Sequence, residues 1–206
     1  MPPEAVVLDI GRVLIHWDPQ GFYDRVIGPT AREQLFAEVD LEDMNERIDN
    51  GAPWRETVYA TAEAHPRRAA EIRLWHDRWI EMASPAIDQS VRLMRSLRAR
   101  GVPVHALTNF GRESFAHACG HYRFFNEFDG AVVSGEHRVM KPAPRIYELV
   151  EEMTGLSGDR LIFTDDNADN IAAARARGWR THLFTGPEGW AARLVAEGLL
   201  DEEEAR

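Results

Sequence analysis

Acidic side chains directly follow two apolar stretches of the sequence. Asp9 follows the run 5–8, and the adjacent pair Asp165 and Asp166 follows a second apolar run. Two neighbouring carboxylates at the end of a buried strand repel each other unless a cation neutralises them. Helix capping is the alternative role, but one or two of the three acids at 165, 166 and 169 would satisfy a cap. The pattern therefore favours a site for Mg²⁺, which prefers hard oxygen ligands.

A single lysine, Lys141, is present among 24 basic residues, and all the others are arginine. Its ammonium is a compact, mobile point charge suited to phosphate and carboxylate, whereas arginine presents a rigid planar fork. We therefore interpret Lys141 as a functional cation. Thr108 and Asn109 end another apolar run and add a hydroxyl and an amide to the candidate groups.

Strands and helices alternate along most of the chain and would position these residues. Short apolar runs predict strands at 5–8, 102–107, 130–133, 160–164 and 181–184. Amphipathic stretches between and after them predict helices, and 201–206 reads as a solvated tail. This alternation is typical of an α/β fold with a doubly wound parallel sheet, in which ligands bind beyond the carboxyl ends of the strands. We therefore expect the polar residues that follow the strands to converge.

The segment 18–84 differs from the rest because its pattern is helical throughout and offers no strand. Its tryptophans Trp54, Trp75 and Trp79 suit a small helical bundle with a modest core of its own. The sequence predicts a core formed by 1–17 and 85–206, with 18–84 inserted after the first strand.

Composition limits the classes of partner. A formal net charge of −10 disfavours nucleic acid and anionic membranes, because both require a basic face. No segment is long and apolar enough to span a membrane, and residues 1–9 do not resemble a signal peptide. We expect a cytoplasmic protein that binds a small anionic molecule at a local site.

Four segments together resemble the haloacid dehalogenase (HAD) superfamily of hydrolases: LDIGRVL, LTN, KPAPRIY and FTDDNADN, in this order. The resemblance covers nearly the whole chain and implies a Rossmann-like core. It also identifies the helical insert with the type 1 cap of that superfamily. Within the superfamily these segments resemble those of bacterial sugar phosphatases of the glucose-1-phosphatase type. The implied activity is Mg²⁺-dependent hydrolysis of a small phosphorylated metabolite through an aspartyl-phosphate intermediate, with a sugar phosphate as the expected substrate.

The resemblance assigns roles to individual residues. Asp9 would attack phosphorus and bind Mg²⁺, with the backbone carbonyl of Gly11 and the carboxylate of Asp166 as further ligands. Thr108 and Asn109 would hold phosphoryl oxygens, and Lys141 would neutralise Asp9 and the transferring group. Asp165 and Asn170 would support the metal or its waters.

One position departs from the family pattern. Most phosphatases of this superfamily carry an aspartate two residues after the nucleophile, as acid for the leaving alcohol and base for water, and this chain has Gly11. One interpretation is a substrate with an acidic leaving group, such as an anomeric hydroxyl, which needs less protonation, while another group, His16 or Asp18, serves the hydrolysis step. The alternatives are a metal-independent 2-haloacid dehalogenase and a catalytically weak protein that binds a phosphate ligand. Arg12 is open to two interpretations, a phosphate contact or a salt bridge to the insert.

Overall fold

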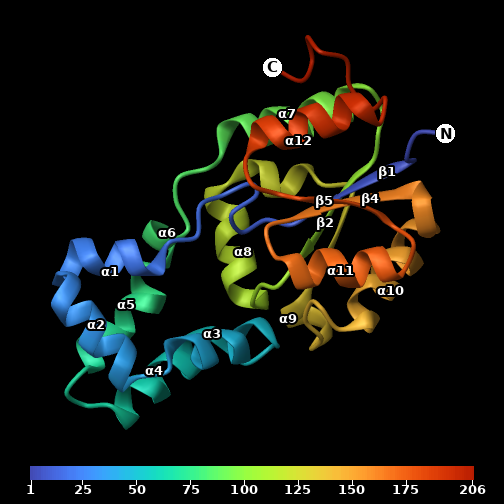
Figure 1. Cartoon of the computed structure of the whole chain (residues 1–206). Coiled ribbons are helices and arrows are strands. Elements are labelled where there is room, and N and C mark those ends of the chain that lie inside the picture. Colours follow the sequence, from blue (N-terminus) through green and yellow to red (C-terminus); the bar gives the residue numbers. More distant parts are fainter.

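Five parallel strands form the centre of the molecule, in the order β3-β2-β1-β4-β5, and the computed structural model describes residues 1–206 (Figure 1). The strands are β1 (Ala5–Leu8), β2 (Val104–Thr108), β3 (Gly130–Val133), β4 (Leu161–Asp165) and β5 (Arg180–Leu183). All five expected strands are present, within two residues at each end. The predicted α/β fold with a parallel, doubly wound sheet is confirmed.

The central strand β1 explains the continuous apolar run near the N-terminus. It pairs with β2 on one side and β4 on the other, and all four of its residues are buried. Val6 and Leu8 belong to the apolar cluster on one face of the sheet, and Ala5 and Val7 to the cluster on the other. Because successive side chains point to opposite faces and both faces are covered, no polar residue is tolerated before Asp9.

Helices cover both faces of the sheet. α10 (Pro144–Thr154) and α11 (Ala168–Ala176) pack on one face, and α7 (Asp88–Ala99) and α12 (Pro187–Ala196) contribute to the cluster on the other (Figure 1). The remaining helices of this part of the chain are α8 (Arg112–His121), α9 (Ser134–His137) and the short 3₁₀ helices Arg123–Glu127 and Gly158–Arg160.

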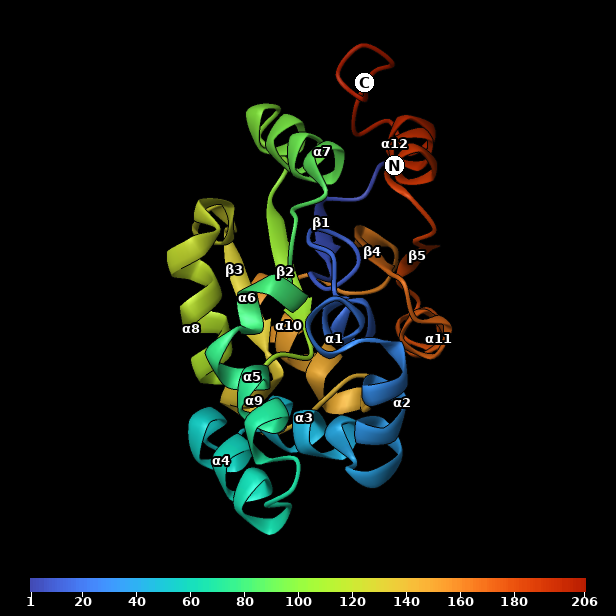
Figure 2. The same ribbon diagram turned by 90° about the vertical axis from the view of Figure 1, so that its left-hand side faces the viewer.

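Six helices and no strand lie between β1 and α7 and form a helical insert beside the sheet (Figure 2). They are α1 (Pro19–Ile27), α2 (Pro29–Glu38), α3 (Leu41–Asp49), α4 (Trp54–Ala64), α5 (Ala69–Asp77) and α6 (Trp79–Met82). No helix of the molecule has both the length and the apolar character required to cross a bilayer.

The expected separate core of the insert is not observed. Trp54, Trp75 and Trp79 belong to one cluster of 41 buried residues that continues into the face of the sheet carrying Leu8. The ring of Trp79 lies 5.4 Å from that of Phe110, which follows β2, so aromatic packing joins the two parts. The insert and the sheet thereby share one apolar core.

The C-terminal tail 201–206 is mostly exposed, as expected of a solvated segment, but two of its residues anchor it to the core. Ala205 is buried, and Glu204 pairs with Arg100 at 2.7 Å and accepts a hydrogen bond from Ser96. Both partners belong to the α7 region, so long-range contacts order a segment whose composition alone predicts solvation.

Gly135 lies in tight contact with the backbone that follows β2, and Gly120 of α8 serves as an uncrowded comparison. A methyl group at Gly135 would meet the backbone nitrogen of Arg112 at 2.6 Å and the carbonyl oxygen of Phe110 at 2.8 Å, whereas Gly120 has open space. We predict that Gly135→Ala lowers the free energy of unfolding by about 1–3 kcal/mol, because backbone atoms must shift. Gly120→Ala, within α8, should raise it by about 0.5–1 kcal/mol. Urea unfolding of both variants checks this, and equal effects would contradict it.

Candidate active site

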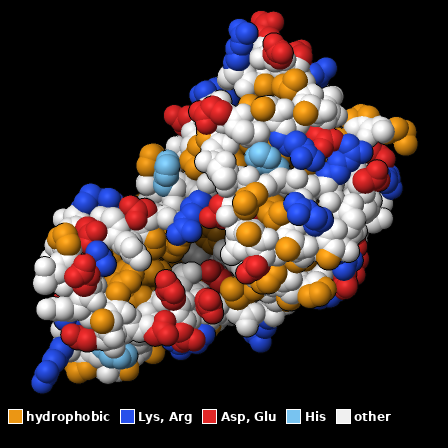
Figure 3. Space-filling view, viewed as in Figure 1, with side chains coloured by type: hydrophobic (Ala, Val, Ile, Leu, Met, Phe, Trp, Pro, Cys, Tyr) orange, Lys and Arg blue, Asp and Glu red, His pale blue; other side chains and the backbone are white.

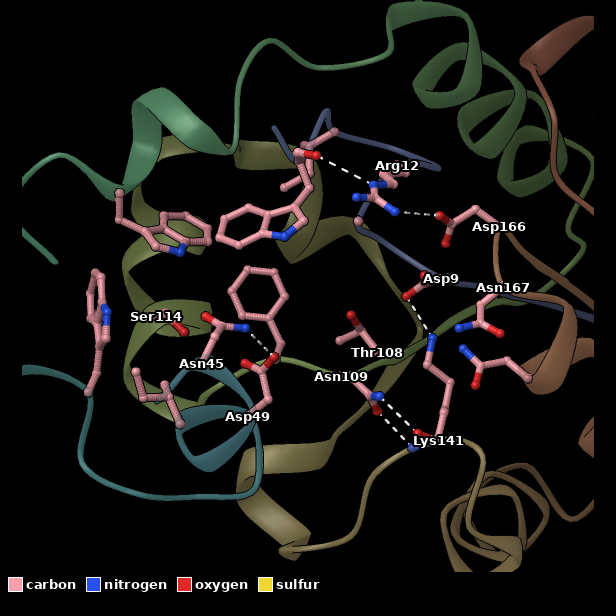
Figure 4. Close-up of a pocket in the computed structure, with 18 residues that line it drawn as sticks. Asp9, Arg12, Asn45, Asp49, Thr108, Asn109, Ser114, Lys141, Asp166 and Asn167 are labelled. Carbon is pink, nitrogen blue, oxygen red and sulfur yellow. Dashed lines mark hydrogen bonds and ion pairs between the residues drawn. The ribbon is translucent and has the colours of Figure 1, made fainter. Parts of the chain in front are cut away.

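Three polar residues meet where the central strands end. Asp9 follows β1 and donates its backbone N–H to the carbonyl of Thr164 at 3.0 Å, so it continues the line of the strand. Thr108 is the last residue of β2, and Asp165 is the last residue of β4. The expected convergence at the carboxyl edge is present, and Figure 4 shows Asp9, Thr108 and Lys141 pointing into one cavity.

Lys141 lies at the centre of this group. Its Nζ is 2.8 Å from Oδ1 of Asp9 and 2.7 Å from Oδ2 of Asp165, and it donates to the carbonyl of Leu107 at 3.0 Å. All three of its protons are therefore used. Burial disfavours the ammonium, but the two carboxylates outweigh this and hold the pKa of Lys141 above its ordinary value. The side chain is a permanent cation that fixes both acids.

Asp165 is fully buried, and both of its oxygens are taken by the protein. Oδ1 accepts from the backbone N–H of Asn167 at 2.8 Å, and Nδ2 of Asn170 lies 3.1 and 3.0 Å from the two oxygens. Oδ2 also accepts from Lys141, so each oxygen of Asp165 already has two donors. The contacts of Asp165 and Asn170 position Lys141.

The carboxyl group of Asp9 is strongly affected by its surroundings. Burial raises the pKa of Asp9 to about 7, the charge of Asp165 adds to the shift, and Lys141 opposes it. A second cation beside the group would favour the ionised form that a nucleophile requires.

The donor set around Asp9 fits a hard divalent cation. Asp9, Asp165 and Asp166 each offer an oxygen, and these lie within 4.8 Å of one another. Asp166 is partly exposed, and its only cation is Arg12 at 3.5 Å. The carbonyl of Gly11, which lines the same cavity, accepts no backbone hydrogen bond. Because Asp165 is saturated, the groups left to hold Mg²⁺ are Asp9, Asp166 and the Gly11 carbonyl.

The side chain of Asn109 is occupied by the loop that carries Lys141. Its Nδ2 donates to the carbonyl of Lys141 at 3.0 Å, and its Oδ1 accepts from the backbone N–H of Lys141 at 2.7 Å. The Asn109 backbone N–H donates to no protein group. The side chain therefore holds the loop in place, and the main chain offers a free donor.

Arg12 has a left-handed backbone with φ of 57° and an exposed guanidinium. Besides Asp166, it contacts the carbonyl of Trp17 at 3.4 Å through Nε. Both contacts are made within the core, so the expected salt bridge to the insert is not present, and a phosphate contact stays a prediction.

The cavity beyond Asp9 has a volume of about 190 Å³ and lies between the sheet and the insert. The space-filling view shows the surface hollowed at this junction, with hydrophobic side chains on the insert side (Figure 3). Its walls from the insert are Asn45, Ile48 and Asp49 of α3 together with Trp54 and Trp79. These side chains close the cavity opposite the carboxyl edge of the sheet.

Asn45 and Asp49 were not identified from the sequence. Asn45 donates from Nδ2 to Oδ2 of Asp49 at 2.8 Å, one helical turn away. Both positions flank the buried stripe formed by Leu41, Met44 and Ile48. A polar pair spaced by four beside an apolar stripe is a weak signal, because only the fold shows that this helix faces the site.

Neither His16 nor Asp18 lines the cavity, so the structure does not support either residue as the replacement for the missing acid. Ile15 is held by bridges to Gly11 and Ala86 and lines the cavity, which turns the adjacent His16 to the exterior. Asp18 instead caps α1 by accepting from the N–H of Gly21 at 2.8 Å.

A family model for haloacid dehalogenase-like hydrolases matches residues 4–178. The chain belongs to this family of hydrolases, as the site geometry and the parallel sheet indicate.

Relatives in the family carry different activities. The chain is 25% identical over 184 residues to drimenol cyclase from Aspergillus calidoustus, covering 87% of this chain and 34% of that protein. It is 33% identical over 86 residues to a sesquiterpene phosphatase from Aspergillus oryzae, and the match covers 42% of this chain and 44% of that protein. It is 30% identical over 87 residues to a haloacetate dehalogenase from Moraxella sp., and the match covers 42% of this chain and 39% of that protein. The chain thus spans about a third to a half of the length of these curated relatives.

A solved structure with the same fold is that of a HAD family enzyme from Bacteroides thetaiotaomicron. It superposes with a TM-score of 0.73 at 20% identity, covering 94% of this chain and 99% of that one. A second structure of that enzyme, in complex with magnesium and inorganic phosphate, gives a TM-score of 0.68 at 21% identity, covering 89% and 95%.

The buried ion cluster predicts a large stability effect. Lys141→Met removes the one cation between two buried carboxylates, so we expect the free energy of unfolding to fall by about 3–5 kcal/mol. The control is Arg145→Met, which removes an exposed cation paired with Glu148 and Glu152 and should cost at most about 1 kcal/mol. Urea unfolding measures both, and similar losses would show that the cluster contributes no more than a surface pair.

Proposed function

We propose that this protein is a Mg²⁺-dependent phosphomonoester hydrolase. Its substrate would be a small phosphorylated metabolite, with sugar phosphates the first class to test. The observation that carries the proposal is the cluster of Asp9, Asp165 and Asp166 at the base of a cavity, where Lys141 pairs with the first two acids and Arg12 with the third. Three carboxylates exceed the charge of these two cations, so the cluster favours a further cation and, through it, an anionic phosphoryl group.

In this reaction Asp9 is the nucleophile. Lys141 holds Oδ1 of Asp9, which leaves Oδ2 to attack phosphorus and form an aspartyl phosphate. The Thr108 hydroxyl and the free N–H of Asn109 would bind phosphoryl oxygens, and Lys141 would offset the charge that develops on them. Bound Mg²⁺ would supply further neutralisation of these oxygens.

The helical insert would act as a type 1 cap, with the division at 18–84 and a core of 1–17 and 85–206. Its residues Ile48, Trp54 and Trp79 line the cavity opposite Asp9 and would surround the part of the substrate that leaves. The cavity of about 190 Å³ suits a small leaving group. The insert would therefore select the substrate, and the core would supply the nucleophile.

Some relatives are dehalogenases, but the negative charge of the site does not favour that activity here. A 2-haloacid is itself a carboxylate, and it would enter a site where Asp9 and Asp166 already lie close together. Without a metal, those acids would repel the substrate. The third alternative, a protein that binds phosphate ligands with little turnover, is separated from the others by assay.

The nucleophile is tested by Asp9→Asn. An amide cannot form the acyl phosphate, so phosphate release should fall by at least about 10⁴-fold. Asp159→Asn, an exposed aspartate in the 3₁₀ helix before β4, is the matched control and should retain full activity. Steady-state phosphate release measures both, and turnover by Asp9→Asn near the control rate would refute the role of Asp9.

The reaction class is tested with the purified protein on a panel of phosphate esters and on L-2-chloropropionate. We expect phosphate release that needs Mg²⁺ and is lost by at least about 10²-fold in EDTA, because the acids around Asp9 then lack their counter-ion. Chloride release in EDTA would establish the dehalogenase alternative instead. If no product forms but phosphate esters raise the melting temperature, the protein is a binding protein.

A further inference from the structure

The proposed reaction needs a proton donor that the first motif does not provide. Cleavage of an alkyl phosphate requires a proton for the leaving oxygen, and hydrolysis of the aspartyl phosphate requires removal of a proton from water. Gly11 has no side chain to do either. The donor must therefore come from another group that lines the cavity.

Ionisable side chains in the cavity wall are few, and most are already committed. They are Asp9, Arg12, Asp49, Lys141 and Asp166; no histidine, cysteine, tyrosine or glutamate lines the cavity. Arginine does not release its proton in proteins, and two carboxylates stabilise the charge on Lys141. Asp9 is the nucleophile, and Asp166 belongs to the cation site. Asp49 is the one carboxyl group left without a role.

Asp49 is held in a defined position on the insert. It is the last residue of α3, and its carboxyl group accepts from Nδ2 of Asn45 at 2.8 Å and from the backbone N–H of Gly111. Its carbonyl accepts from Oγ of Ser134 at 2.6 Å. Figure 4 shows Asp49 on the α3 side of the cavity and Asp9 on the sheet side, with Thr108 between them. This is the side from which a leaving group would be reached.

The protonation state of Asp49 suits proton exchange. Burial raises the pKa of Asp49 to about 7, and the charges of Glu46 on the same helix and Asp9 across the cavity add to the shift. The hydrogen bonds from Gly111 and Asn45 oppose it. Both forms are therefore populated near neutral pH, the condition in which one group serves as acid and then as base.

We propose, on the basis of the phosphatase function above, that Asp49 on the insert performs the acid and base steps that Gly11 cannot. In the first step Oδ2 of Asp9 bonds to phosphorus, the bond from phosphorus to the ester oxygen breaks, and that oxygen takes the proton of Asp49. The alcohol leaves. In the second step the Asp49 carboxylate takes a proton from water as the water oxygen bonds to phosphorus. The bond to Asp9 then breaks, inorganic phosphate is released, and both residues return to their starting forms.

A purely structural role for Asp49 is the competing explanation, because its carboxyl group also links α3 to the start of α8 through Gly111. Asp49→Asn separates the two. The amide oxygen can still accept hydrogen bonds and preserve the link, but the side chain no longer exchanges a proton. Asp43→Asn is the matched control, since Asp43 is an exposed aspartate of the same helix, paired with Arg47.

The test compares two leaving groups in the presence of Mg²⁺. p-Nitrophenyl phosphate releases a stable phenolate that needs no proton, whereas an alkyl phosphate releases an alkoxide that does. Rapid-quench measurement of the first turnover should show alcohol release from the alkyl ester slowed by about 10²–10⁴-fold in Asp49→Asn. The nitrophenolate burst should change by less than about tenfold and be followed by slow turnover, because the aspartyl phosphate accumulates. Asp43→Asn should match the wild type on both esters.

A second variant restores an acid from the core. A Cβ at Gly11 would meet no atom within 4 Å, so a side chain can begin there without displacing the backbone, and Gly11→Asp is the variant to make. In the Asp49→Asn background it should recover at least about tenfold of the alkyl-ester rate, which a structural defect in α3 would not allow.

Two results would overturn the proposal for Asp49. One is a first turnover of the alkyl ester by Asp49→Asn within about threefold of the wild type, and the other is an equal loss on both esters. Failure of the phosphatase function itself looks different, because the wild-type protein would then release phosphate from neither ester, and the role of Asp49 would fall with it.

Discussion

The ammonium of Lys141, buried between Asp9 and Asp165, is the interaction on which the site depends. Two buried carboxylates this close together repel each other, and the ammonium between them offsets that repulsion. Several further hydrogen bonds hold Lys141 and Asp165 in this arrangement. Leu107 accepts the third proton of the ammonium, Asn170 and Asn167 complete the shell of Asp165, and Asn109 fixes the main chain of Lys141.

The parallel sheet makes this arrangement possible because its strands end together. β1 lies between β2 and β4, so the residues that follow these three strands share one edge, although about 150 residues of sequence separate the first from the last. The loop carrying Lys141 precedes α10 and reaches the same edge from the β3 side. The acids and the cation are brought together by strand order.

The helical insert supplies the other half of the cavity. Its tryptophans join the buried cluster of the sheet, so the cavity wall formed by α3 is held against the carboxyl edge by a continuous apolar core. The chemistry of the site is therefore divided between two parts of the chain. The core contributes the charged cluster, and the insert contributes apolar surface and the polar pair of Asn45 and Asp49.

The sequence alone determined the five strands, the helical segment after the first, and the family. A continuous apolar run that ends in an acid is typical of a buried parallel strand. Lys141 was identifiable because it is the one lysine among arginines. Tertiary structure decided the rest. The exclusion of His16, the saturation of Asp165 and the placement of Asp49 depend on how α3 and the loop after β1 lie against the sheet. Such positions follow from packing between segments distant in sequence, which local periodicity does not encode.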